Sequence, residues 1–147
     1  MSAEDFFTKE EKQAITGAIA EAELNTSGEI RLHVENRCKI DVLDRAAYIF
    51  GKLNMHETGQ RNGVLFYLAV DDHKFAIIGD AGINKVVPAN FWDEIKQTML
   101  ALFKEGKFAE GLSMGIRMAG EQLKANFPYH HNDINELSDE ISFEKDL

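Results

Sequence analysis

Residues 61–84 read RNGVLFYLAVDDHKFAIIGDAGIN, and this stretch decides the fold. It contains the longest apolar run of the chain, Val64–Val70, then three polar residues, DDH, and a second apolar run, Phe75–Ile78. Two short, β-prone runs separated by a few polar residues predict a β-hairpin. The first run has no alternating polar positions, so we expect a central strand that is buried on both faces.

The second run ends in a glycine turn, Gly79-Asp80-Ala81-Gly82. Antiparallel pairing would return Asp80 to a position beside Arg61 and Asn62, where the first strand of the hairpin starts. Flanking glycines let the backbone approach a ligand closely, and a carboxylate among exposed carbonyls suits Ca²⁺ or Mg²⁺. Glu29 begins an earlier strand and falls at the same end of the sheet. The pattern predicts either a cation site made of Asp80, Glu29 and Asn62, or a plain turn with solvated carboxylates.

The segments before the hairpin predict two helices and a strand. Thr8 and Glu11 have the spacing of a capping box and start the first helix. Residues 29–35, EIRLHVE, alternate between apolar and polar, which is typical of a strand with one face in solvent, near a sheet edge. The face assigned to the core is Ile30, Leu32 and Val34, and the face assigned to solvent is Glu29, Arg31, His33 and Glu35.

A helix capped by Asp41 connects this strand to the hairpin, and right-handed crossovers of this kind join parallel strands. The hairpin then adds an antiparallel strand. Pro88 suits the first turn of a third helix, and a fourth follows Gly106 and ends at Pro128. We therefore expect one α/β domain over residues 1–128 with a mixed sheet, and an acidic tail over residues 129–147 that packs on the domain or extends from it.

A second group of carboxylates lies at the opposite end of the predicted sheet. Asp71 and Asp72 occupy the hairpin turn, and Glu35 ends the parallel strand beside it. Ligands of open α/β sheets usually bind outside the carboxyl ends of parallel strands, which favours a metal site here. Aspartates are also common in hairpin turns for purely structural reasons. Both interpretations of Asp71 and Asp72 stay open from the sequence.

Composition restricts the class of partner. The chain of 147 residues has a net charge of −9, which argues against nucleic acid or an anionic membrane as a partner, whereas cations remain suitable. No signal-peptide pattern and no apolar run long enough to span a membrane is present, so we expect a cytoplasmic monomer. One cysteine, Cys38, allows no internal disulfide. Zinc-ligand spacings, phosphate-binding loops and a nucleophile elbow are all missing from the sequence.

Three motifs in order resemble the TPM domain family: Ser27-Gly28-Glu29-Ile30, Arg61-Asn62-Gly63-Val64-Leu65 and Gly79-Asp80-Ala81-Gly82-Ile83. The helical end of the family is matched by Phe103, Phe108, Gly111 and Gly115, and Asn135–Ile141 is similar to the tail of stand-alone bacterial members. The resemblance implies a Rossmann-like three-layer α/β/α sandwich, a divalent-cation site for which Ca²⁺ is the usual ion, and, for the thylakoid-lumen founders, acid phosphatase activity. Asn84-Lys85 departs from the family, which often has an acidic residue shortly after the glycine turn.

Three functions follow as hypotheses. The first is a stand-alone metal-binding domain with weak or no catalysis, and it is favoured because the chain supplies oxygen ligands but no nucleophile–base pair. The second is a metal-dependent acid phosphatase acting on phosphomonoesters, with Asp80 and Arg61 as candidate catalytic residues. The third is an interaction module whose hairpin end and acidic tail contact another protein.

Overall fold

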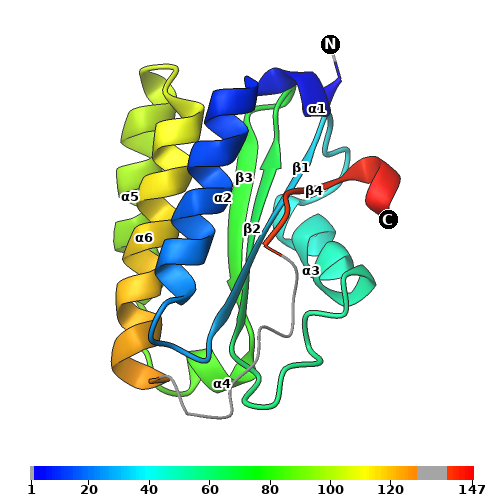
Figure 1. Ribbon diagram of the computed structural model, residues 1–147. Helices are drawn as coiled ribbons and strands as arrows, with labels where there is room; N and C mark the ends of the chain where they lie inside the picture. The colour runs from blue at the N-terminus through cyan, green and yellow to red at the C-terminus, as the bar shows by residue number, and fades with distance from the viewer. Residues whose placement is uncertain (1, 129–138) are drawn as a thin grey trace.

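The computed structural model describes residues 2–128 and 139–147, which form three layers with a mixed sheet in the middle. Figure 1 shows helices α2, α5 and α6 on one face of the sheet and α3 on the other. This arrangement confirms the predicted α/β/α sandwich. The elements in chain order are α1 (Ala3–Phe6), α2 (Lys9–Glu23), β1 (Glu29–Glu35), α3 (Val42–Lys52), β2 (Gly63–Ala69), β3 (Lys74–Gly79), α4 (Ala81–Asn84), α5 (Phe91–Lys104), α6 (Phe108–Asn126), β4 (Ser142–Phe143) and a 3₁₀ turn, η1 (Glu144–Asp146).

The strand order β3-β2-β1-β4 follows from one crossover and one hairpin. β1 pairs with β2 in parallel through the α3 crossover, and β2 pairs with β3 in antiparallel fashion. Both pairings were predicted. At the other side of β1, β4 adds two residues in parallel register, with His33 opposite Ser142.

The larger hydrophobic core lies between the sheet and the layer of α2, α5 and α6. It receives the predicted apolar faces of α2 and β1 together with alternate residues of β2. The capping box of Thr8 and Glu11 starts α2 as expected, with both reciprocal hydrogen bonds present. Helices α5 and α6 approach closely at Gly115, where a Cβ atom would lie only 2.4 Å from the sulfur of Met99. Glycine at position 115 therefore allows the two helices to pack closely.

A smaller core lies on the opposite face of the sheet, under α3. Asp41 caps this helix by accepting hydrogen bonds from the amides of Leu43 and Asp44, as predicted. The helix packs Ala46 and Ile49 on the second face of β2 and β3. Since both faces of β2 are covered, all seven of its residues are buried, which confirms the predicted central strand.

The predicted position of β1 near a sheet edge is confirmed, because only the short β4 lies beyond it, but the predicted solvent-exposed face is wrong. Glu29, His33 and Glu35 are 2 %, 0 % and 1 % exposed. The second layer explains the difference, because α3 and the segment 139–147 cover this face and β4 pairs along its outer side. Arg31 on the same face interacts electrostatically with Glu140 and Asp146 of that segment, although burial lowers the pKa of its guanidinium.

Two further details differ from the sequence-based expectation. The short helices α1 and α4 were not predicted, because each is a single turn with no amphipathic period to reveal it. Pro88 lies before the N-cap residue, Asn90, so it is not in the first turn of α5. In the described part of the chain, no helix combines the length and apolar character needed to cross a membrane.

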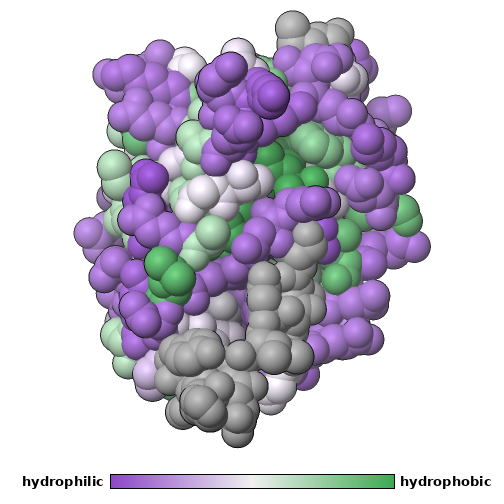
Figure 2. Space-filling model, in the orientation of Figure 1, coloured by the Kyte–Doolittle hydropathy of each residue, from purple (hydrophilic) through white to green (hydrophobic). Residues whose placement is uncertain are grey.

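The end of the acidic tail belongs to the sheet. Residues 139–147 contain β4 and η1, and their Ile141 and Phe143 pack against the larger core. The acidic residues of the tail before position 139 and most of the Asn135–Ile141 motif lie outside the described residues. Figure 2 shows a mostly hydrophilic face with scattered hydrophobic groups, which fits the high proportion of charged residues.

Candidate functional site

The register of the strands brings the predicted residues of the glycine turn to one end of the sheet. Glu29 lies opposite Gly63, and Val64 lies opposite Gly79. The amide of Asp80 donates to the carbonyl of Gly63 at 2.9 Å. The backbone of Glu29, Asn62 and Asp80 therefore lies at one end of the sheet, where β1 and β2 start and β3 ends, as the sequence predicted. We call this region the glycine-turn end, and its residues are Glu29, Arg61, Asn62 and Asp80.

Asp80 is held by a two-pronged ion pair with Arg61. Arg61 Nε lies 2.7 Å from Asp80 Oδ2, and Arg61 Nη2 lies 2.8 Å from Oδ1. Asp80 also caps α4 by accepting from the amide of Ala81. Burial acts to raise the pKa of this carboxyl, but the hydrogen bonds from Arg61 and Ala81 outweigh it and lower the pKa. Asp80 is thus a buried carboxylate that is already neutralised by a neighbour.

The backbone around this pair is tightly constrained. The amide of Gly82 donates to the carbonyl of Arg61, and a Cβ atom on Gly82 would lie 2.1 Å from the carbonyl oxygen of Gln60. Only glycine fits this close approach. Arg61 itself has a φ of 52°, in the left-handed region that few side chains adopt readily. The loop before β2 and the turn after β3 are therefore locked together at the site.

Asn62 has a side-chain oxygen to which no described residue donates a hydrogen bond. Its amide nitrogen Nδ2 donates to Ser27 Oγ at 3.3 Å, and its backbone amide donates to Thr58 Oγ1. Its side-chain oxygen Oδ1 is buried, and within the described residues nothing donates a hydrogen bond to it. A buried acceptor without a donor is costly, so its position favours a cation or a water as ligand.

Glu23 is a protonated carboxyl close to Glu29. Burial raises the pKa of Glu23 to about 10, assisted by a hydrogen bond with Asp139 and by the nearby charge of Glu29. Glu23 Oε2 accepts from the amide of Ile30 at 2.8 Å. Glu23 is therefore neutral at physiological pH, and it offers a cation much weaker attraction than Glu29 or Asp80.

The donor set of the glycine-turn end fits a small, hard cation. Two buried carboxylates, a buried amide oxygen and loop carbonyls are oxygen ligands of the kind that Ca²⁺ and Mg²⁺ prefer. No group of three or more His, Cys, Asp or Glu side chains that could hold a metal occurs in residues 2–128 and 139–147. A cation here would rely on Asn62 and backbone oxygens besides Glu29 and Asp80, and it would compete with Arg61.

The hairpin turn uses its aspartates differently. Asp72 accepts from the amide of Cys38 at 2.7 Å, and Asp71 accepts from Asn36 Nδ2 at 3.2 Å. Both fasten the loop after β1 to the hairpin. Glu35 does not join them, because its carboxylate is buried and bonded to other residues. The structure therefore does not assemble the predicted group of Asp71, Asp72 and Glu35.

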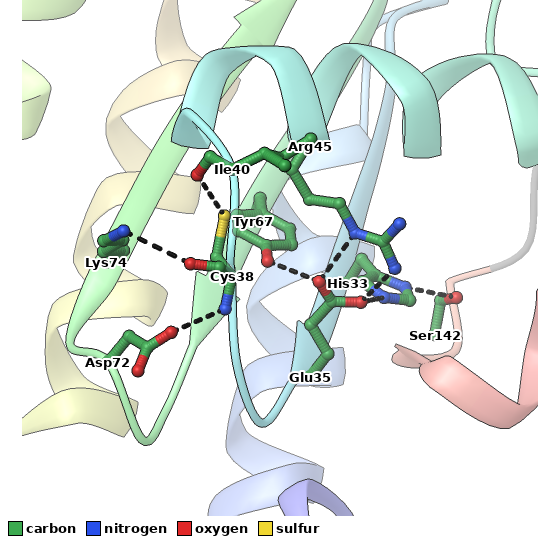
Figure 3. Close-up of polar contacts among 9 residues, drawn as sticks. All are labelled: His33, Glu35, Cys38, Ile40, Arg45, Tyr67, Asp72, Lys74 and Ser142. Carbon is green, nitrogen blue, oxygen red and sulfur yellow. Dashed lines mark hydrogen bonds and ion pairs between the residues drawn. The ribbon is translucent and has the colours of Figure 1, made fainter.

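Glu35 is instead the centre of a buried polar network, drawn in Figure 3. His33 Nε2 lies 3.1 Å from Glu35 Oε1, Tyr67 donates from its hydroxyl, and Arg45 approaches with Nε at 2.8 Å and Nη2 at 2.9 Å. Burial would raise the pKa of Glu35, but hydrogen bonds from His33, Arg45 and Tyr67 lower it to about 2. The carboxylate is charged at any physiological pH.

This network was not predicted, because the polar side chains of β1 were assigned to solvent. Two signals could have revealed it: Tyr67 within an otherwise apolar strand, and Arg45 beside the apolar stripe of α3. Ser142 Oγ, His33 and Glu35 are hydrogen-bonded in a row, which is the order of a hydrolase triad. Ser142 and His33 are both 0 % exposed, so no substrate reaches this serine as the chain is folded.

Comparisons with known proteins agree with the fold. The sequence model of the TPM domain matches residues 1–122. The NMR structure of the BA42 protein from the psychrophilic bacterium Bizionia argentinensis is 49% identical, with a TM-score of 0.89, and the match covers 95% of this chain and 97% of that one. No curated protein matches the chain.

Two more distant solution structures share the fold alone. The N-terminal domain of a protein from P. gingivalis is 18% identical with a TM-score of 0.70, and the match covers 87% of this chain and 84% of that one. The N-terminal domain of a protein from Corynebacterium glutamicum is 12% identical with a TM-score of 0.65, and the match covers 88% and 85%.

Proposed function

The chain belongs to the TPM domain family, and we propose that it binds one divalent cation, Ca²⁺ or Mg²⁺, at the glycine-turn end, with weak or no catalysis. The observation that supports this proposal best is the side-chain oxygen of Asn62. It is buried at the same sheet end as Glu29 and Asp80, and no described residue donates to it. A bound cation would satisfy this oxygen and offset the two buried carboxylates.

Arg61 competes with a cation for the carboxylate of Asp80. It neutralises Asp80 from outside, with about half of its side chain exposed, so it can swing into solvent at little cost. A cation that takes Asp80 must displace it. We therefore propose that Arg61 acts as a competing counter-ion. It keeps the affinity for the cation moderate, and it pairs with Asp80 when no cation is bound.

Weak or absent catalysis is proposed because no exposed serine in the described part of the chain is hydrogen-bonded to a histidine. In the described part of the chain, the one serine–histidine pair with a supporting carboxylate is Ser142 with His33, and it is buried. A bound cation could polarise a phosphate oxygen, and this is the chemistry it would contribute if the alternative, an acid phosphatase, were correct. Asp80 and Arg61 would be the residues nearest to that chemistry.

The test is calorimetric titration of chelator-treated protein with Ca²⁺ and with Mg²⁺. Asp80→Asn should weaken the affinity by about tenfold or more, because it removes a ligand charge while keeping the shape. Asp71→Asn is the matched control, since it removes one carboxylate from the opposite sheet end, and it should leave the affinity unchanged. Equal affinities in the three proteins would contradict a site at the glycine turn.

Release of p-nitrophenol from p-nitrophenyl phosphate, with each metal and at acidic and neutral pH, tests the catalytic part. We expect no turnover above that of the Asp80→Asn variant. Metal-dependent turnover that vanishes in Asp80→Asn would establish the phosphatase instead.

A further inference from the structure

A groove of about 670 Å³ lies between helices α5 and α6, at the end of the pair where α5 begins. Figure 1 shows the two helices side by side on one face of the sheet. At the other end of the pair they approach closely, because Gly111 and Gly115 of α6 face Phe103 and Met99 of α5. Towards the start of α5 the facing side chains are larger, and a groove remains between the helices. We call it the α5–α6 groove.

The floor of the groove is apolar and adaptable. The two helices contribute Phe91, Ile95 and Met118 to it, of which Ile95 is buried and the other two are half-buried. A methionine side chain is flexible and polarisable, so it fits partners of different shape. Phe91 also lines a second, small cavity of about 10 Å³, together with Trp92 and residues at the end of α6. Phe91 therefore has room to shift when another side chain enters the groove.

The rim of the groove carries three exposed carboxylates, those of Asp93, Glu94 and Glu121. Within the described residues, Asp93 and Glu94 make no ion pair, and Glu121 pairs only with Lys124, at 3.6 Å. The side chain of Glu121 is 76 % exposed, so solvent screens this pair. The lining that the structure describes contains no lysine or arginine. The groove therefore has an excess of negative charge, which favours a cationic ligand.

Three exposed amide side chains, those of Asn90, Gln97 and Gln122, complete the polar lining. An amide both donates and accepts hydrogen bonds, so it can bind the peptide groups of another chain. A small hydrated cation would use the carboxylates of the rim but would leave the apolar floor without a partner. A peptide in which lysine or arginine alternates with large apolar residues would contact the carboxylates, the amides and the floor together.

We propose that the α5–α6 groove binds a short cationic, amphipathic segment of another protein. The apolar side chains of the segment enter between Phe91, Ile95 and Met118, and its lysine or arginine side chains face Asp93 and Glu94. Apolar anchors in a groove, with complementary charges around them, are a common way for a protein to recognise a peptide. None of the lining residues belongs to the glycine-turn end, so this site is separate from the proposed cation site.

Trp92 gives a direct signal of binding, because it is the single tryptophan and its ring meets that of Phe91 edge to face at 4.6 Å. The full chain, with chelator present, is titrated with a short capped peptide of lysine and leucine, and both the tryptophan emission and the assigned amide resonances are followed. We expect saturable changes in both, with amide shifts at Gln97, Met118 and Gln122. A lysine–serine peptide of the same length and charge, and spermidine, should each bind about tenfold more weakly.

Two variants test the rim of the groove. Asp93→Asn and Glu94→Gln each remove one exposed charge, and each should weaken binding of the lysine–leucine peptide about threefold. Glu10→Gln is the matched control, because it removes an exposed carboxylate from the first turn of another helix, α2, and it should leave the affinity unchanged. Equal losses in the three variants would overturn the proposal, as would a response that does not saturate, or equal binding of the lysine–serine peptide or of spermidine. Because chelator keeps metal out of the titration, none of these outcomes bears on the proposed cation site.

Discussion

Arg61 holds both oxygens of Asp80 from a backbone conformation that disfavours most side chains. Its φ of 52° lies in the left-handed region, where asparagine is tolerated much better than arginine. The sequence predicted that the two residues would be neighbours, because strand register follows from the hairpin. An arginine before a central strand usually pairs with a nearby carboxylate, but the sequence left both Glu29 and Asp80 as partners, since the choice depends on the direction of one exposed side chain.

Arg61→Asn therefore separates the two roles of this residue. The variant keeps the left-handed backbone and removes the cation that competes for Asp80, so we expect the Ca²⁺ affinity to rise by about threefold to tenfold. Calorimetric titration measures this directly, with Arg37→Asn as a control for the loss of one positive charge. A fall in affinity would mean that Arg61 supports the site instead of competing for it.

The lowered pKa of Glu35 leads to a second prediction, which concerns the stability of the fold in acid. Its pKa is about 2 in the folded protein, against 4.5 for an ordinary glutamate, so its stabilising contribution is complete above pH 4.5 and is lost as the pH falls towards 2. The shift corresponds to about 3 kcal/mol of unfolding free energy. Glu35→Gln should lose about this amount at neutral pH and show a flatter decline below pH 4.5.

Urea unfolding at a series of pH values checks the prediction for Glu35. Glu110→Gln, which neutralises an exposed glutamate on α6, is the control and should follow the wild type. If Glu35→Gln and Glu110→Gln gave the same acid profile, the buried network would not be the source of the acid sensitivity.

Among the helices and strands, β1 is the one that was predicted correctly on one face and wrongly on the other. Its length, its apolar face and its parallel pairing with β2 were all predicted correctly from alternation and crossover handedness. Its polar face was assigned to solvent because Glu, Arg, His and Glu are usually exposed. In the structure, β4 and η1 cover this polar face. Both are too short to show a periodic sequence pattern, so they could not be predicted locally.

The contact between Glu23 and Asp139 makes the docking of this last segment sensitive to pH. The folded pKa of Glu23 is raised from 4.5 to about 10, so the stability it contributes is complete below pH 4.5 and is lost as the pH rises towards 10. Glu23→Gln mimics the protonated form, because an amide can donate to Asp139 and still accept from Ile30. We expect the variant to be more stable than the wild type at pH 9 by on the order of 1 kcal/mol, with little difference at pH 4.

Urea unfolding at the two pH values measures this difference, and amide exchange at Phe143 reports whether the β4 segment is the part that loosens. Glu21→Gln, two residues earlier on the exposed side of α2, is the matched control. If the unfolding free energies of the wild type and Glu23→Gln changed equally with pH, the raised pKa of Glu23 would be refuted.

For the whole molecule, the sandwich places two polar regions at opposite ends of one sheet. The end with Asp80 carries carboxylates and an amide oxygen to which no described residue donates, whereas the end with Arg45 carries cations around a pocket. The layers, strand order and glycine-turn geometry could be predicted, because they follow from periodicity, turn residues and handedness. The cationic pocket could not, because it needs a buried glutamate on one strand to orient an arginine on a helix ten residues later.

Cation binding at the glycine-turn end is tested most directly by a Ca²⁺ titration of chelator-treated protein, followed through assigned amide resonances. We expect saturable shifts at Gly79, Asp80, Gly82 and Asn62, with the resonances of Asp71 and Asp72 unchanged. Shifts confined to Asp71 and Asp72 would place the cation at the hairpin turn instead. No saturable shift with either Ca²⁺ or Mg²⁺ up to millimolar concentration would contradict cation binding altogether.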